Sequence, residues 1–359
     1  MTALLVVVAL AFAWNLGAHY TGAVMGMPYA ARSISLWPAL ALIAVMTVLG
    51  ATFASGRVET TVGQQIISDQ LVSKSDALAI VLAAGSLTML YNYLRIPTST
   101  IQILVFCVVG VGLAGNIPIH WTTIGKLAVV WVCAPCVAFG LGFLFTRLID
   151  RMVPPRLTQA QAQQQLVAAS SAERNQHWLA RAVPGLLTAE RPFPADPAPL
   201  PRSTVVLLRV LPLLLVGVGI AASFVLGAND VSNATGVFIL THLYSLMLAG
   251  FLGGVAMAVG ALTWGERILH TIAFDVVKMD LAMASAAQGV QALVVLIAAA
   301  FGFFTSMNQA LIGAMAGTGF ARGRETVQRK QLRGILRGWL IGPLSGLAVA
   351  AIIERLFRL

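Results

Sequence analysis

Long apolar runs, separated by short polar stretches, are the main pattern along the chain. They lie at residues 3–16, 36–55, 75–95, 98–116 and 122–148, and again at 204–226, 237–263, 281–304, 306–321 and 338–356. Helical runs of about 20 apolar residues are long enough to cross the ~30 Å hydrocarbon core of a bilayer. Alternating ten-residue strands, which would indicate a membrane β-barrel, are absent from the sequence. The pattern therefore predicts an all-α, polytopic membrane protein.

A polar stretch at residues 149–202 separates five apolar segments from the next five. It contains a Gln-rich run at 159–165 and eight prolines, a composition that cannot bury a core. We therefore predict a first transmembrane repeat at 1–148, a polar cytoplasmic linker at 149–202 and a second transmembrane repeat at 203–359. If each of the five segments crosses the membrane, the second half enters it in the opposite orientation. The two halves would then form an inverted repeat.

Matching residues at a nearly constant offset support the inverted repeat. Residues 17–26 match 227–236 and residues 57–62 match 267–272 at an offset of 210, and residues 98–112 match 305–319 at an offset of 207. Duplicated halves with Gly-interrupted membrane segments are typical of secondary transporters, which bind substrate near the midplane between the repeats. We therefore expect discontinuous or re-entrant helices at the repeat interface, with the short segments at 98–116 and 306–321 as candidates for re-entrant hairpins.

Composition and charge narrow the class of protein. Hydrophobic residues make up 58% of the chain and charged residues only 10%, whereas soluble domains carry roughly 25% charged residues, so a soluble fold is excluded. The basic residues behind the net charge of +10 gather in loops, among them 147–202 and 322–337. Short basic loops are retained in the cytoplasm, so this charge indicates orientation and not a nucleic-acid site. We expect a multi-pass protein of the inner (plasma) membrane that contacts the lipid bilayer and no nucleic acid.

Asp230 is the clearest candidate for chemistry inside the membrane. It is the only acidic residue between Val205 and Leu262, and polar groups at membrane depth tend to be functional or paired with one another. It follows Asn229 in a Gly-Ala-Asn-Asp string where a helix can break and expose N–H groups to an anion. Asn233 shares the face of Asn229 if the helix resumes. Such a group can bind Na⁺, carry a proton or accept a hydrogen bond from a protonated oxyanion. The alternative is an Asp paired to a neighbouring helix for packing.

Two clusters of polar side chains recur at the starts of matching segments. They comprise Thr98, Ser99 and Thr100 in the first half, and Thr305, Ser306 and the nearby Asn308 in the second. Pro97 ends the preceding helix, so the first cluster lies where the next helix begins. Hydroxyls and free N–H groups at a helix N-terminus can hold an anion. Ordinary N-capping is the alternative for a single copy, but the recurrence favours binding.

Residues 227–234 (GANDVSNA) resemble the signature of the inorganic phosphate transporter (PiT) family, which normally occurs once in each half. The resemblance continues through 267–272, 277–280 (VKMD) and the second hydroxyl cluster, and covers nearly the whole chain apart from the linker. It implies symport of an oxyanion with Na⁺ or H⁺ by alternating access. The implied substrate-binding residues are Gly17, Ala18, His19, Thr98, Ser99, Thr100, Asn229, Asp230, Asn233, Thr305, Ser306 and Asn308, and the implied site of the coupling ion comprises Asn229, Asp230 and Asn233.

The first half departs from the family signature. His19, Tyr20 and Ala23 stand where the family has Asn, Asp and a later Asn. This change removes an anionic ligand for Na⁺ and an acceptor for the acidic hydrogens of phosphate, and it leaves His19 and Tyr20 as donors. Sulfate at neutral pH needs donors alone, and the string at 15–18 (NLGA) before a degenerate signature resembles the bacterial sulfate permease branch. We therefore predict a sulfate symporter coupled to H⁺ or Na⁺, with phosphate as the alternative substrate.

Other function classes have less support in the sequence. An intramembrane enzyme using a Ser or His19 with Asp230 would need a nucleophile, a base and an oxyanion hole. Duplicated polar sites suit alternating access better, so we expect no enzyme and no catalytic residue; an anion channel is a third alternative. Cys133 and Cys136 have CxxC spacing in an apolar run, so we interpret them as core cysteines and expect no metal and no cofactor besides the coupling ion. The oligomeric state is open, with a homodimer among the alternatives.

Overall fold

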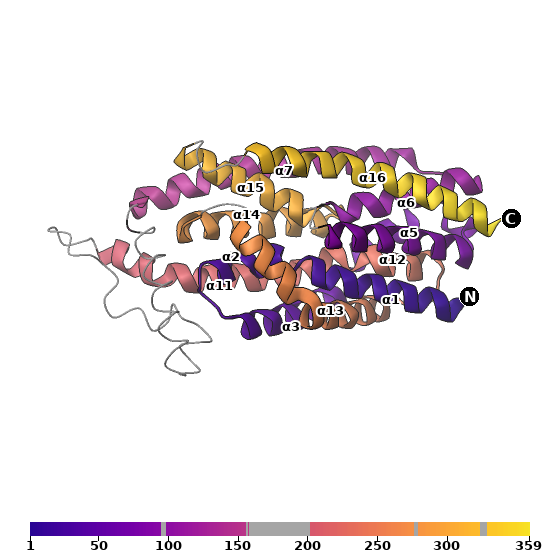
Figure 1. Cartoon of the computed structure of the whole chain (residues 1–359), viewed down its shortest axis with the longest axis horizontal. Coiled ribbons are helices and arrows are strands. Elements are labelled where there is room, and N and C mark those ends of the chain that lie inside the picture. The colour runs from indigo at the N-terminus through magenta and orange to yellow at the C-terminus, as the bar shows by residue number, and fades with distance from the viewer. Residues whose placement is uncertain (95–97, 156, 158–201, 276–278, 324–328) are drawn as a thin grey trace.

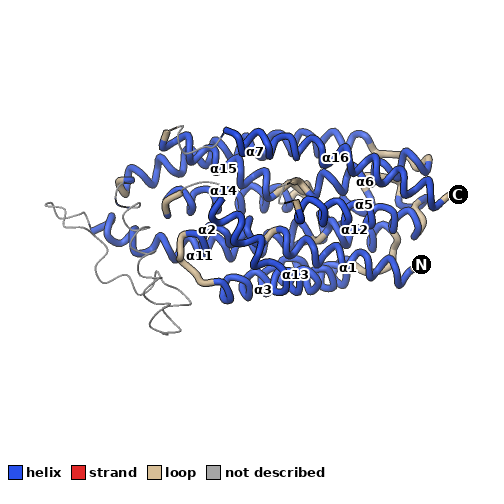
Figure 2. Tube along the Cα trace, in the orientation of Figure 1, coloured by secondary structure: helices blue, strands red, loops and turns tan. Residues whose placement is uncertain are grey.

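The computed structural model describes residues 1–94, 98–155, 157, 202–275, 279–323 and 329–359. Within these residues every named element is a helix, which confirms the predicted all-α class (Figure 2). Most of the predicted linker at 149–202 lies outside the described residues. Parts of the family-like string at 277–280 and of the basic loop at 322–337 lie outside them as well.

The helices of the first half have counterparts in the second half. In chain order they are α1 (Thr2–His19), α2 (Thr21–Ala30), α3 (Leu36–Ala54), α4 (Gly56–Gln64), the short helix η1 (Asp69–Leu71), α5 (Lys74–Tyr93), α6 (Thr100–Gly115) and α7 (Trp121–Met152). After the linker come α11 (Arg202–Asp230), α12 (Ser232–Leu240), α13 (Leu246–Asp275), α14 (Leu281–Ala300), α15 (Met307–Arg322) and α16 (Arg329–Phe357). The starts of α3 and α13 are 210 residues apart and those of α6 and α15 are 207 apart, which are the offsets of the sequence repeat.

Within the described residues, eight helical stretches are long and apolar enough to cross a membrane, four in each half. They are Thr2–Ala30, Leu36–Ala54, Lys74–Tyr93, Trp121–Met152, Leu208–Leu240, Leu246–Arg267, Leu281–Ala300 and Leu336–Phe357. The helices α6 and α15 have 16 residues each, or about 24 Å of helix, and fall short of the bilayer core. The chain is therefore a multi-pass membrane protein, and the predicted ten segments become eight long stretches and two shorter helices.

The predicted segment at 237–263 was wrong at its start. Residues 237–240 complete α12, and α13 begins only at Leu246, after a turn in which His242 adopts the left-handed conformation with φ 51°. Arg32 makes the equivalent turn after α2, with φ 55°. The sequence pattern missed α2 and most of α12 because polar residues interrupt the apolar run without ending the helical path.

Figure 1 shows where each half enters the bundle. The helix α1 begins at the end where both chain termini lie, whereas α11 begins at the opposite end (Figure 1). The helices α5 and α6 lie towards the end with the termini, and α14 and α15 lie towards the other end. An inverted repeat predicts this arrangement, and the orientation of the halves in the membrane stays a prediction.

Two equivalent glycines allow close backbone contact between the halves. A Cβ atom on Gly17 of α1 would lie 1.9 Å from the carbonyl oxygen of Met257 in α13. A Cβ atom on Gly227 of α11 would lie 2.1 Å from the carbonyl oxygen of Thr47 in α3. Small residues of this kind are typical of tight helix packing in membranes. Gly17, which we predicted to bind substrate, therefore lies at a helix crossing.

The cysteines are only partly in the core. Cys107 is buried in α6, but Cys133 and Cys136 are exposed on α7, so the interpretation of this pair as core cysteines was wrong. Val129 and Val132 are also exposed on α7, as expected for a helix face that contacts lipid. In the described part of the chain, no group of three or more His, Cys, Asp or Glu side chains could hold a metal ion.

Candidate functional site

Two helix breaks lie at the signature strings. Tyr20 separates α1 from α2, and Val231 separates α11 from α12. Polar side chains surround both breaks and are buried: His19 is 6% exposed, and Asn229, Asp230 and Asn233 have no exposed surface. Such groups need partners inside the protein, because the bilayer core offers no water.

The segments that lead into α6 and α15 each supply a serine cap. The Ser99 hydroxyl accepts a hydrogen bond from the N–H of Gln102 at 3.3 Å, and Ser306 accepts from the N–H of Gln309, also at 3.3 Å. Both are N-cap residues of the usual kind. For the two serines, the capping alternative describes the geometry correctly.

The threonines beside these serines differ from them. The hydroxyl oxygens of Thr98 and Thr305 are fully buried and have no hydrogen-bond partner. A buried hydroxyl without a partner is costly. These two hydroxyls are therefore available as donors to a ligand, one from each half.

Asn229 joins the second break to the start of α15. Its amide nitrogen donates to the carbonyl oxygen of Thr305 and to Oδ2 of Asp230, both at 2.9 Å. Its amide oxygen accepts from the N–H of Thr305 at 3.3 Å. With both ends of its amide occupied, Asn229 holds the site together, while Oδ1 of Asp230 has no partner.

His19 occupies the first break with both ring nitrogens engaged. Asn92 donates from its amide nitrogen to Asn15 at 2.6 Å, so the amide oxygen of Asn92 faces Nδ1 of His19 and accepts from it. Nε2 of His19 then accepts from the amide of Asn308 at 3.1 Å. This assignment follows from the hydrogen-bond network, and it describes a neutral imidazole that links the two halves.

Thr100 is the meeting point of the two breaks. Its hydroxyl lies 2.7 Å from the hydroxyl of Tyr20, and it accepts from the amide of Asn233 at 3.1 Å. The Tyr20 hydroxyl is also close enough to interact electrostatically with Asp230. The amide oxygen of Asn233 has no partner. Tyr20 thus places a hydroxyl group where the second half has its carboxyl group, Asp230.

Two glutamines connect the starts of α6 and α15. Gln102 donates to Gln309 at 3.4 Å, and Gln309 donates to Gln102 at 3.1 Å. The two residues are 207 apart, so each is the repeat counterpart of the other. The pair is buried, at 8% and 2% exposure, and fixes the spacing of the two helix starts.

Most of the predicted site residues come together in this cluster. They are His19, Thr98, Thr100, Asn229, Asp230, Asn233, Thr305 and Asn308, with the capping serines Ser99 and Ser306 beside them. Gly17 lies outside the cluster, and Ala18 contributes a carbonyl that accepts from the Thr21 hydroxyl. The cluster offers the free oxygens of Asp230 and Asn233 as acceptors and two threonine hydroxyls as donors, a set that fits an oxyanion together with a small cation or proton.

Several residues of the cluster were not predicted. Gln102 and Gln309 served only as markers of the repeat, and their equivalence was the signal that could have placed them on the repeat interface. Asn92 and Asn15 gave no comparable signal, because their partners depend on how α5 crosses α1.

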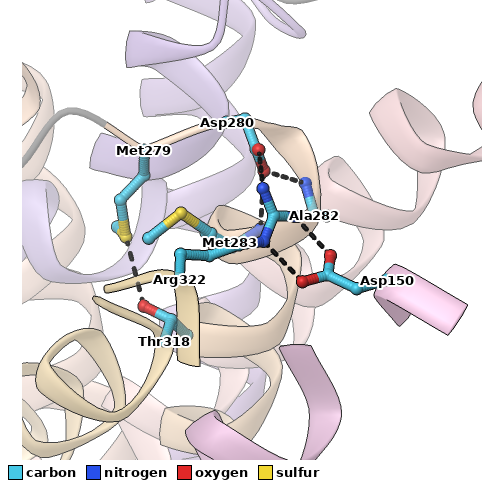
Figure 3. A network of polar contacts seen from close by, with 7 residues as sticks. All are labelled: Asp150, Met279, Asp280, Ala282, Met283, Thr318 and Arg322. Atoms are coloured by element: carbon cyan, nitrogen blue, oxygen red, sulfur yellow. Dashed lines mark hydrogen bonds and ion pairs between the residues drawn. The ribbon is translucent and has the colours of Figure 1, made fainter. Parts of the chain in front are cut away.

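An ion network ties the ends of α7, α14 and α15 together (Figure 3). Arg322 donates to Asp150 from Nε at 2.6 Å and to Asp280 from a terminal nitrogen at 2.7 Å, with 8% of its side chain exposed. Asp280 also caps α14 by accepting from two backbone N–H groups at 3.0 Å. At the opposite end Arg358 contacts Glu354 at 2.5 Å and Asp76 at 3.4 Å, but it is 48% exposed. Each end of the protein thus has one Arg held by two carboxylates.

Comparison with known proteins gives a family and relatives. The family described as "Phosphate transporter family" matches residues 16–350. The chain is 25% identical over 354 residues to "Sulfate permease CysP" of Bacillus subtilis (strain 168), covering 97% of this chain and 86% of that protein. It is 27% identical over 411 residues to "Inorganic phosphate transporter 2-1, chloroplastic" of Arabidopsis thaliana, covering 96% and 70%.

A solved structure has a similar fold. The structure titled "The sodium-dependent phosphate transporter" superposes with a TM-score of 0.82 at 21% identity, and the match covers 100% of this chain and 99% of that one. The likeness therefore extends over the whole helical arrangement.

Proposed function

The chain belongs to the phosphate transporter family, and on that premise we propose that it is a secondary active symporter that moves sulfate across the plasma membrane, coupled to H⁺ or Na⁺. The observation behind the choice of substrate is that Asp230 is the one carboxylate at the breaks, where the first half presents Tyr20 and His19. The buried cluster is then the substrate site, shared between the halves.

Sulfate fits the balance of donors and acceptors. At neutral pH it carries no hydrogen, so it is bound by donors alone, and the free hydroxyls of Thr98 and Thr305 are donors of this kind. Binding sulfate leaves Asp230 free for the coupling ion. Phosphate brings one or two acidic hydrogens, which would need Asp230 as acceptor and leave the coupling cation without an anionic ligand.

The coupling ion would bind at Asp230 and Asn233. Each has a buried side-chain oxygen without a hydrogen-bond partner, and oxygen ligands suit hard cations such as Na⁺. A proton on Asp230 would serve the same purpose. Asn229, which we predicted as a third ligand, has its oxygen occupied by the N–H of Thr305 and acts here by holding Asp230 in place.

Phosphate is the second candidate substrate. It is favoured by the names of the Arabidopsis relative and of the structural neighbour, both of which are phosphate transporters by title. In that case the free oxygen of Asp230 would accept the acidic hydrogen of phosphate, and Tyr20 and His19 would replace the missing Asp and Asn.

Uptake by purified protein in proteoliposomes tests the proposal. Labelled sulfate is supplied under a Na⁺ gradient or an H⁺ gradient, with unlabelled phosphate, thiosulfate and molybdate as competitors, and empty liposomes serve as the control. We expect saturable sulfate uptake that phosphate does not block, under one of the two gradients. Uptake of phosphate alone would assign the second substrate, and uptake of neither anion under any gradient would reject the transport proposal.

A further inference from the structure

Glu59 is a fully buried carboxyl group outside the anion site. It lies in α4, which follows the apolar stretch of α3 and is outside the eight candidate spans. Its side chain has no exposed surface. Glutamate is almost never fully buried unless a partner compensates its charge, and the described ion pairs do not include Glu59.

Each hydroxyl beside Glu59 faces two acceptors with one hydrogen. Oε1 of Glu59 lies 2.7 Å from the hydroxyl of Thr235, which also lies 2.9 Å from the carbonyl oxygen of Val231. Ser55, a second hydroxyl bonded to the carboxyl group, donates to the carbonyl oxygen of Ala51 at 2.5 Å. A hydroxyl carries a single hydrogen, so neither can satisfy both a helix carbonyl and a carboxylate.

A protonated Glu59 satisfies the contact with Thr235 without competing for the hydrogen that Thr235 gives to Val231. The carboxyl hydrogen can be donated to the Thr235 oxygen, which leaves the Thr235 hydrogen for Val231. An ionised Glu59 would accept only, and its Oε2 has no donor at all. Burying such a charge without a partner is strongly unfavourable. In agreement, burial raises the pKa of Glu59 to about 7 against the opposing effect of the two hydroxyls.

The elements around α4 supply little charge that could hold an ionised Glu59. Between their bounds α3, α12 and α14 carry no titratable side chain. The other titratable residues of the elements nearby are Arg57 on α4, Arg202, Arg209 and Asp230 on α11, and Glu266, Arg267, His270 and Asp275 on α13. Arg57 donates to the carbonyl oxygen of Ala300, and Glu266 and Arg267 are exposed.

The helix α4 contacts two segments of the second half that contribute to the anion site, namely α12 and the segment before Thr305. Thr235, the partner of Glu59, lies on α12 only two residues after Asn233. On its other side, α4 is held to the segment before Thr305 by the hydroxyl of Thr61, which donates to the carbonyl oxygen of Gly302 at 2.8 Å. The docking of α4 on α12 therefore positions the helix that carries Asn233.

We propose that Glu59 is a proton-binding site whose protonation is required for α4 to dock on α12 and so to enclose the anion site. Deprotonation would place an unpaired charge in this contact and open it. The inference rests on the proposed transport function for its role in the cycle, but the proton site itself can be tested without any substrate.

The first test is the thermal stability of the purified protein in detergent, without anion, from pH 5 to pH 8. Because its folded pKa is raised, Glu59 stabilises the fold below its unfolded pKa near 4.3, and this stabilisation is lost as the pH rises through about 7. We expect the melting temperature of the wild type to fall by several degrees over this range. In Glu59→Gln, whose amide donates as the protonated acid does, this fall should be much smaller. Glu266→Gln, an exposed acid on α13, should behave like the wild type.

The second test is sulfate exchange across proteoliposomes with equal pH on both sides. Above pH 7 the wild-type rate should fall roughly tenfold per pH unit, since the protonated fraction falls by that factor, whereas Glu59→Gln should keep its rate. Equal pH profiles of melting and exchange in the two proteins, or a Glu59→Gln variant that does not fold, would overturn the proposal. If no anion exchanges in either protein, the transport function fails, and the melting data still decide on Glu59.

Discussion

The two helix breaks have the same backbone plan and different chemistry. In the first, His19 and Tyr20 engage Asn308 and Thr100 through neutral groups. In the second, Asn229 engages the backbone of Thr305 and holds a carboxylate with one free oxygen. The second break thus has a carboxyl group, Asp230, where the first has the hydroxyl of Tyr20.

This difference separates the residues that pack the helices, which are alike in the two halves, from the residues at the breaks, which differ. The crossings at Gly17 and Gly227 and the caps at Ser99 and Ser306 are nearly the same in both halves, because helix packing needs them whichever ligand is bound. In the proposed function the side chains at the breaks contact the ligand, so they can differ. Substitutions at equivalent positions should therefore have equal effects in the scaffold and unequal effects at the breaks.

The largest effect is expected for Asp230→Asn. The amide is nearly isosteric, so the fold should persist, but the variant loses the carboxylate that we propose binds the coupling ion. We expect concentrative sulfate uptake to fall by roughly 100-fold or more, with the melting temperature close to the wild-type value. Glu266→Gln, which removes an exposed acid, is the control. Undiminished concentrative uptake in Asp230→Asn would remove this residue from the coupling mechanism.

Alanine at either crossing glycine should come next, with similar losses in the two halves. The new methyl group would meet a backbone carbonyl 1.9 Å away for Gly17→Ala and 2.1 Å away for Gly227→Ala. Overpacking of this kind costs about 2 kcal/mol, measured as a lower melting temperature in detergent. Gly217→Ala on α11 is the matched control, because a methyl group there meets nothing within 4 Å. A loss confined to one half would contradict the equivalence of the crossings.

The double variant His19→Asn, Tyr20→Asp should turn the first break into a copy of the second. It restores an acceptor for the acidic hydrogen of phosphate, so the preference for sulfate over phosphate should shift by about tenfold. Competition between the two labelled anions in proteoliposomes measures the shift. Tyr93→Phe, at a residue that is 73% exposed, is the control. An unchanged preference would mean that the break side chains do not select the substrate.

Removal of the serine caps should have the smallest effect, again equal in the two halves. Ser99→Ala and Ser306→Ala each remove one acceptor for a backbone N–H, which costs about 1 kcal/mol of stability. Threonine at the same positions keeps the acceptor and should restore the melting temperature. If one serine also binds substrate, its alanine variant will lose affinity beyond what its partner loses.

The sequence predicted the fold class and most of the cluster, for identifiable reasons. Apolar runs show which segments enter a membrane, and the fixed offset pairs residues such as Thr98 and Thr305 before any contact is known. The apolar pattern predicts that this membrane segment ends at residue 226, because the polar string 227–233 ends the apolar run. In the structure the helix continues to Asp230, since Asn229 finds partners on Thr305.

The roles of the other site residues depend on contacts in the folded protein that the sequence alone does not reveal. Ser99 and Thr98 are neighbours with similar chemistry, yet one caps a helix and the other has a free hydroxyl. Their roles follow from how the helix start sits against the opposite half. The same holds for the contact of Asn92 with Asn15 and for that of Glu59 with Thr235, both between residues far apart in the sequence.

The bond between Gln102 and Gln309 joins two copies of one position, each giving and receiving a hydrogen. In a carrier with two inverted repeats, opening to one side and then to the other exchanges the conformations of the two halves. A contact made by one half is then replaced by the equivalent contact of the other half. The Gln102–Gln309 contact is its own counterpart, so such an exchange leaves it unchanged. The two halves could therefore change shape while this pair of hydrogen bonds stays intact.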